Sequence, residues 1–115
     1  MEHQINVIDP QRTVIHLSGR LDAQSAPSVR TLFADVVGGG HNLIVIDLAG
    51  VPFVDSSGLS ALVSCLRAAR EKQGRLVLAG VRTQAQIAIK QTRLDQVLVM
   101  HPDVTTALAA LALLG

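Results

Sequence analysis

The order of hydrophobic and polar positions along the chain predicts strands that alternate with helices. Short apolar or alternating runs predict strands, at residues 5–8, 14–17, 43–48, 76–79 and 97–100. Apolar residues spaced three and four apart predict helices, between Ser25 and Gly38, from Gly58 to Gly74, over residues 83–91 and after Asp103. Asp9-Pro10 favours a turn between the first two strands, so we expect that pair to form an antiparallel hairpin. Alternation after the hairpin predicts an α/β fold with a mostly parallel sheet.

Polar and conformationally special residues mark the expected ends of these helices. Ser25 is expected to cap the first helix, and Pro27 is compatible with its first turn. Gly38 and Gly74 are expected to end the first two helices. Asp103 is expected to cap the C-terminal helix, which is rich in Ala and Leu.

Composition bounds the architecture to one domain over residues 1–115. A chain of 115 residues, 49% of them hydrophobic, buries a core without disulfides or metals. Phe33 and Phe53 are its 2 phenylalanines and there is no Trp or Tyr, so the predicted core is aliphatic. No change of composition divides the chain, and no repeat of 20–50 residues is present.

Charge and hydropathy indicate a soluble cytoplasmic protein that contacts neither nucleic acid nor membrane. The net charge is +1, and the basic residues form no stripe. The N-terminal residues do not form a signal peptide. The most apolar tail, residues 107–114, is far shorter than the ~20 residues that span a bilayer. The 1 cysteine, Cys65, excludes an internal disulfide and suits a reducing compartment. We expect a monomer or weak dimer.

Motifs for catalysis, metal binding and cofactor binding are missing from the sequence. The glycines at 38–40 follow a helix rather than a strand and precede His41, which is the wrong context for a phosphate-binding loop. The four histidines lie far apart without metal-ligand spacing or a neighbouring carboxylate motif. Cys65 lies at the border of an apolar helix face, which favours packing over nucleophilic chemistry. We therefore expect no enzyme, no metal and no cofactor.

The segment Asp55-Ser56-Ser57-Gly58 carries the most specific polar chemistry. It lies between the apolar strand at 43–48 and an amphipathic helix, so its hydroxyls lie at or near a helix N-terminus. Such a position suits a helix cap. It also suits a phosphorylated serine, because unpaired backbone N–H groups and the helix dipole favour an anion there. The local sequence leaves both readings open.

The helix after this segment has one apolar and one polar face. Leu59, Leu62, Val63, Leu66 and Ala69 share the apolar face, and the opposite face carries Ser57, Ser60, Ser64, Arg67 and Glu71. A row of small hydroxyls lets a partner approach closely, and it is equally compatible with plain solvation.

The stretch VPFVDSSGLSALV resembles the signature of the STAS domain, and the chain is most similar to the small anti-sigma factor antagonists of that family. The likeness extends to a loop at residues 18–22, to the strand and loop at 43–59, and to the strand at 75–80. It implies the STAS fold, with an N-terminal hairpin and about four helices. Arg93 departs from the pattern, since relatives often have glycine in that region, so the end of the third helix is expected to differ.

The resemblance implies a phosphorylation switch at Ser56. Asp55 is its neighbour at the helix start, Asp22 is the acidic residue of the facing loop, and Ser57 is a secondary phosphoacceptor candidate. The unphosphorylated protein would bind an anti-sigma factor that is also a serine kinase, and so release the sigma factor. Phosphorylation would break the complex and a serine phosphatase would restore it. With these residues, the predicted partner-binding surface comprises Asp22, Asp55, Ser57, Gly58, Ser60, Ser64 and Arg67.

Two other functions remain open from the sequence. A STAS protein can be an accessory subunit that scaffolds a signalling or lipid-transport complex without switching. A small β–α fold can also be an enzyme or a nucleotide-binding module, although no base, nucleophile or phosphate loop is recognisable. Kinase-dependent labelling of Ser56 separates the first alternative from the switch, and a nucleotide titration with a turnover assay tests the second.

Overall fold

The chain forms one mixed five-stranded sheet with the strands in sequence order, β1-β2-β3-β4-β5. The computed structural model describes residues 1–112. Its elements are β1 (Glu2–Val7), β2 (Arg12–Ser18), α1 (Ala26–Gly38), β3 (Leu43–Gly50), α2 (Ser56–Glu71), β4 (Arg75–Ala79), α3 (Thr83–Gln91), a 3-10 turn η1 (Leu94–Gln96), β5 (Met100–His101) and α4 (Val104–Ala112). β1 pairs with β2 antiparallel and the other pairs are parallel. The predicted fold class is confirmed.

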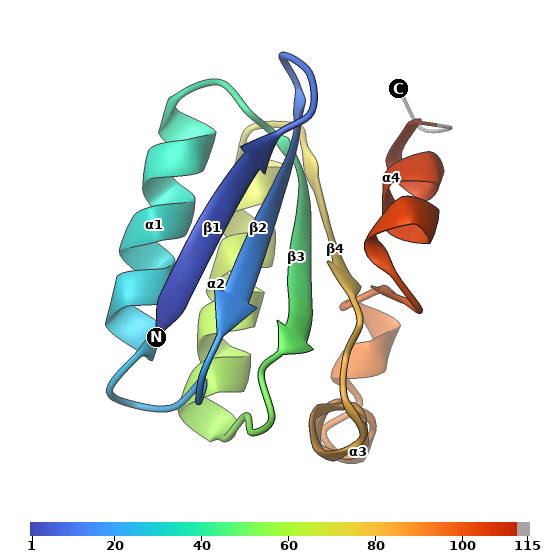
Figure 1. Cartoon of the computed structure of the whole chain (residues 1–115). Helices are drawn as coiled ribbons and strands as arrows, with labels where there is room; N and C mark the ends of the chain where they lie inside the picture. Colours follow the sequence, from blue (N-terminus) through green and yellow to red (C-terminus); the bar gives the residue numbers. More distant parts are fainter. Residues whose placement is uncertain (113–115) are drawn as a thin grey trace.

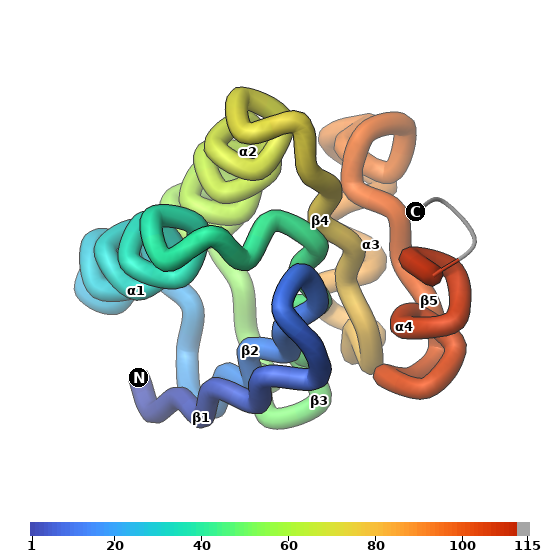
Figure 2. The backbone as a smooth tube through the Cα atoms, turned by 90° about the horizontal axis from the view of Figure 1, so that it is seen from above, coloured from blue at the N-terminus to red at the C-terminus, as the bar shows by residue number. Residues whose placement is uncertain are grey.

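The helices form two unequal layers on the sheet. α1 and α2 cover one face, α4 packs on the other face over β3 and β4, and α3 lies beyond one end of the strands (Figures 1 and 2). Successive strand side chains point to opposite faces, so Ile15 and Leu17 of β2 enter the core under α1 and α2 while Val14 faces α4. Among the described residues, no helix is long and apolar enough to cross a membrane.

Two predicted strands have different bounds in the structure. β1 begins at Glu2 and ends at Val7, so it takes in polar residues that the apolar run at 5–8 does not mark. The last strand is present but shorter and later than the predicted 97–100: Val97 closes η1, and β5 contains only Met100 and His101. Leu98 is fully buried because the loop turns its side chain into the core. The apolar pattern at 97–99 therefore reflects burial of Leu98 more than a full strand, although the Val99 carbonyl accepts from the Leu78 N–H of β4 at 2.8 Å.

The prediction that Ser25 caps α1 is wrong, because its side chain does not bond the helix. Ser25 occupies the N-cap position, but its side chain makes no capping bond to the helix. Its hydroxyl instead donates to the Arg20 carbonyl at 2.7 Å and accepts from the Asp22 N–H at 3.0 Å. It thus stabilises the loop before the helix. Asp103 does cap α4, since its carboxylate accepts from the Thr106 N–H at 2.8 Å.

The ends of the middle helices depend on non-glycine residues in the left-handed region. Gln73, with φ 59°, follows Lys72, the C-cap of α2. Gly74 comes next because a side chain there would collide with the carbonyl oxygen of Asn42. Arg93, also with φ 59°, ends the turn after α3. The expected difference at Arg93 therefore concerns the residue type, because the backbone there still adopts a left-handed conformation that favours glycine.

Candidate functional site

The site is built where the loop after β2 meets the loop after β3. Leu21 and Val54 form an isolated parallel bridge between these loops. The N–H of Leu21 donates to the Phe53 carbonyl at 2.9 Å, and the N–H of Asp55 donates to the Leu21 carbonyl at 3.2 Å. Leu21 and Val54 are both buried, so the bridge is anchored in the core. The two loops that the sequence separates by about thirty residues thus form one unit.

Gly58 allows the start of α2 to lie directly on the Leu21 backbone. An added Cβ at Gly58 would collide with the carbonyl oxygen and with the side chain of Leu21. Gly58 is buried, so its contribution to the candidate surface is this close approach and not an exposed contact. A glycine here is a packing requirement and not a conformational one, since its φ is not positive.

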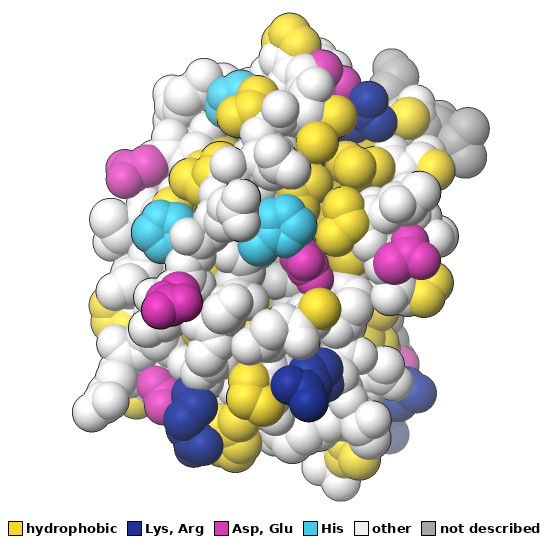
Figure 3. All heavy atoms as spheres, in the orientation of Figure 1, with side chains coloured by type: hydrophobic (Ala, Val, Ile, Leu, Met, Phe, Trp, Pro, Cys, Tyr) yellow, Lys and Arg dark blue, Asp and Glu magenta, His cyan; other side chains and the backbone are white. Residues whose placement is uncertain are grey.

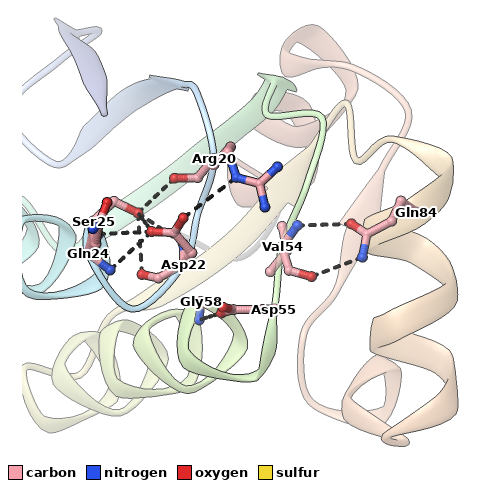
Figure 4. Close-up of polar contacts among 8 residues, drawn as sticks. All are labelled: Arg20, Asp22, Gln24, Ser25, Val54, Asp55, Gly58 and Gln84. Carbon is pink, nitrogen blue, oxygen red and sulfur yellow. Dashed lines mark hydrogen bonds and ion pairs between the residues drawn. The ribbon is translucent and has the colours of Figure 1, made fainter.

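Asp55 is the N-cap of α2. Its backbone is extended and its carboxylate accepts from the Gly58 N–H at 3.0 Å (Figure 4). Within the described residues, the N–H groups of Ser56 and Ser57 donate to no protein acceptor. Two free donors, the N–H of Ser56 itself and that of its neighbour, therefore lie at the positive end of a helix of 16 residues, and the Ser56 side chain is exposed. Ser57 is only half exposed.

Asp22 lies on the facing loop in a network of short bonds. Its carboxylate accepts from the N–H groups of Gln24 at 3.0 Å and Ser25 at 3.2 Å, and it lies 3.7 Å from the Arg20 guanidinium (Figure 4). Partial desolvation opposes its charge, but these N–H groups and the cation outweigh it and lower the pKa of Asp22. Arg20 also stacks 4.2 Å from the centre of the Phe53 ring. The loop therefore holds an ionised carboxylate beside the bridge, with the Arg20 cation next to it.

Gln84 holds the other side of the same loop, which the sequence did not indicate. Its amide oxygen accepts from the Val54 N–H at 2.9 Å, and its amide nitrogen donates to the Val54 carbonyl at 3.0 Å (Figure 4). The residue belongs to α3 and lies 30 positions along the chain from Val54. A glutamine on the polar face of a short helix gives no local signal for such a contact.

The polar row of α2 borders a shallow groove of about 310 Å³. Its lining includes four predicted site residues, together with apolar side chains of α2 and two residues that follow α3: Ser56, Leu59, Ser60, Val63, Ser64, Arg67, Thr92 and Leu94. Ser57 is not among them. Ser60 and Arg67 are exposed and Ser64 is half-buried, with its hydroxyl donating to the Ser60 carbonyl at 3.0 Å. The structure thus brings Ser56, Ser60, Ser64 and Arg67 to one surface.

The remaining candidates stay outside this site. Cys65 is buried, and desolvation raises the pKa of its thiol to about 12, which fits packing. In the described part of the chain, no group of three metal-ligating side chains is present. His16 does have a carboxylate neighbour that the sequence concealed: β2 and β3 place it beside Asp47, with 2.7 Å between Nδ1 and Oδ2. Figure 3 shows histidine and acidic side chains among apolar ones on this open face of the sheet.

Comparison with known proteins identifies the family of this chain. A family model described as STAS domain matches residues 3–107. The anti-sigma-B factor antagonist of Listeria monocytogenes is 31% identical over 78 residues, which cover 68% of each chain. The crystal structure of an anti-sigma factor antagonist from Mycobacterium paratuberculosis is 26% identical, with a TM-score of 0.83, 96% of this chain and 93% of that chain being covered. The Bacillus protein SpoIIAA in its phosphorylated form shares the fold, at 19% identity, a TM-score of 0.71, and coverage of 91% of this chain and 96% of that one. The chain therefore belongs to the STAS domain family, among its anti-sigma factor antagonists.

Proposed function

We propose that this protein is a partner-switching anti-sigma factor antagonist whose switch is Ser56. The observation that carries the proposal is the exposed Ser56 at the start of α2, beside two free backbone N–H groups. The loop that contains it is bridged to the loop of Asp22. A kinase could reach this hydroxyl, and the helix start accommodates the phosphate that results.

Electrostatic repulsion explains why phosphorylation would weaken partner binding. A phosphate adds about 1.5–2 negative charges and three acceptor oxygens. At Ser56 it would lie next to Asp55 and near the charged Asp22 loop, so a partner that accommodates a neutral hydroxyl would meet concentrated negative charge. The free N–H groups and the helix dipole favour the anion by about 0.3–2 kcal/mol. Phosphorylation would therefore leave the fold in place and disrupt the interface.

The names of similar proteins support the nature of the partners. The Listeria relative is called an anti-sigma-B factor antagonist, and SpoIIAA has been solved in a phosphorylated form. We propose that the partner here is an anti-sigma factor with serine kinase activity, and that a serine phosphatase reverses the modification. We place these events in the cytoplasm. The proposed contact surface is the α2 groove with the Asp22 loop, and the protein itself acts as a binding module without catalysis.

The test begins with a search for the kinase. Unphosphorylated protein is used as bait, any captured ATPase is purified as a recombinant protein, and it is then incubated with the bait and ATP. We expect one added phosphate, mapped to Ser56 by mass spectrometry. Ser56→Ala should remain folded, resist labelling and keep binding the captured kinase, whereas the matched control Ser57→Ala should still be labelled. Phosphate found only on Ser57, or partner binding without any labelling, would favour the secondary site or a scaffold.

A further inference from the structure

Val54 has a backbone pairing partner, Leu21, on one side only. Its chain neighbours Phe53 and Asp55 use their backbone groups to bond Leu21. The N–H and the carbonyl of Val54 point the other way, toward α3 (Figure 4). Because Val54 is buried, leaving these two groups unpaired would cost stability.

The amide of Gln84 supplies the bonds that a neighbouring strand would have made. One side chain satisfies both groups, with its oxygen 2.9 Å from the Val54 nitrogen and its nitrogen 3.0 Å from the Val54 oxygen. Figure 4 shows the two bonds side by side between α3 and the loop that leads into α2. The loop is thus held by Leu21 on one side and by Gln84 on the other. Asp55 and Ser56 follow Val54 directly, so their position depends on both contacts.

We infer that Gln84 is a positioning residue for the switch, holding the loop so that Ser56 is presented to the kinase and to the binding partner. The inference rests on the proposed function for its consequence and on the two hydrogen bonds for its mechanism. Without them, the loop would occupy its bound geometry for only part of the time. A partner that binds only this geometry would then have its affinity reduced in proportion to the fraction of molecules that adopt it. The rate of phosphate transfer to Ser56 in the bound complex would be unchanged.

Two glutamines of α3 provide a matched experiment. Gln84→Met keeps the length of the side chain and removes both bonds to Val54. Gln86→Met removes a bond of the same kind, from the Gln86 amide to the Val81 carbonyl at 2.8 Å, which does not involve the loop. We expect hydrogen exchange at the Val54 N–H to be at least about tenfold faster in Gln84→Met and within about twofold of the parent in Gln86→Met.

Kinetics with the captured kinase test the functional consequence. Gln84→Met should raise the KM for phosphorylation of Ser56 about tenfold and leave kcat unchanged, whereas Gln86→Met should alter neither. Equal exchange at Val54 in both variants would overturn the inference, and so would faster exchange with an unchanged KM. Failure of the proposed function would be seen separately, as absence of Ser56 labelling in the parent protein.

A conservative variant supplies a rescue that general destabilisation cannot mimic. In Gln84→Glu the carboxylate still accepts from the Val54 N–H but repels its carbonyl; once protonated, the carboxyl can again accept and donate. Exchange at Val54, corrected for the pH dependence of the parent, should therefore slow to near the parental rate below about pH 4, close to the ordinary glutamate pKa of about 4.3. Gln84→Met should show no such recovery, and recovery in Gln84→Met or none in Gln84→Glu would contradict the mechanism.

Discussion

The two faces of the sheet differ in how much they bury and in what they support. The face under α1 and α2 carries the larger core, which includes Phe33, Ile46 and Leu62 and continues beneath the loops of Leu21 and Val54. The face under α4 has a small cluster of valines, alanines and one fully buried leucine: Val14, Val45, Val77, Ala79, Ala107 and Leu111. Every element that forms the candidate site is thus attached to the larger core.

This difference indicates that α4 can be disturbed without disturbing the candidate site. α2 presents its polar row to solvent because its opposite side is packed against β4 and α1. The main contacts of α4 are with the sheet, where Ala107 and Leu111 join the smaller cluster. Disturbing the larger core should therefore disturb the whole molecule, whereas disturbing the α4 face should act locally.

The largest expected effect separates the two cores directly. Leu62 and Leu111 are both 0% exposed, so truncation of each removes the same buried atoms. Leu62→Ala should lower the free energy of unfolding by about 2–5 kcal/mol. Leu111→Ala should cost less, under about 2 kcal/mol, because α4 packs on a smaller cluster and can detach while the rest stays folded. Urea denaturation gives both values, and equal costs would show that the two cores are one cooperative unit.

The next effect concerns the contact between α2 and the Asp22 loop. Gly58→Ala should destabilise the protein by about 1–3 kcal/mol, because the new methyl group displaces the Leu21 backbone. Gly38→Ala is the control: it lies in the last turn of α1 with open space around it, so the gain in helix propensity should stabilise by about 0.5–1 kcal/mol. Thermal or urea unfolding measures both signs. A neutral Gly58→Ala would mean that the loops are less closely packed than the structure shows.

A surface charge should distinguish the same two faces by binding rather than by stability. Ser60→Glu adds charge and bulk in the α2 groove and should weaken binding of the captured kinase at least ~10-fold, a loss of about 1.4 kcal/mol. Gln4→Glu adds the same charge on exposed β1, and it should leave the affinity unchanged. Both should alter stability by only about ±0.5 kcal/mol. Titration calorimetry on the folded variants decides, and unchanged affinity in Ser60→Glu would place the interface elsewhere.

The smallest effect is a loss of stability in acid. The pKa of Asp22 is lowered, as described above, and the Thr106 N–H lowers the pKa of Asp103, each from an ordinary value of 3.8. Each ionised carboxylate therefore stabilises the fold above about pH 4, and this contribution disappears as the pH falls through the folded pKa. Asp22→Asn and Asp103→Asn should each show a smaller loss of stability between pH 7 and pH 3 than the parent. An unaltered loss in both would mean that other carboxylates cause the acid sensitivity.

Local patterning in the sequence was sufficient for the elements that combine a clear period with end signals. The β-branched run of β3, the apolar stripe of α2 and the capping aspartate Asp103 all appear where they were predicted, whereas the cap of α2 is Asp55 and not a serine hydroxyl. These features depend on interactions within a few residues, which a sequence displays directly. The polar row followed from the same periodicity: its members Ser60, Ser64 and Arg67 do share a surface, which Ser56 joins and Ser57 does not.

Only the tertiary structure decided which distant groups meet. Gln84 and Gln86 both lie on α3 two positions apart, yet one bonds the loop of Ser56 and the other bonds Val81, just before the helix. Leu98 looked like part of a strand because an apolar residue is buried in the same way in a strand or in a loop. Ser25 looked like a cap because it directly precedes a helix, but its hydroxyl bonds Arg20 instead of the helix. The sheet register placed Asp47 beside His16. Such contacts depend on how strands cross and align, and no short stretch of sequence encodes that geometry.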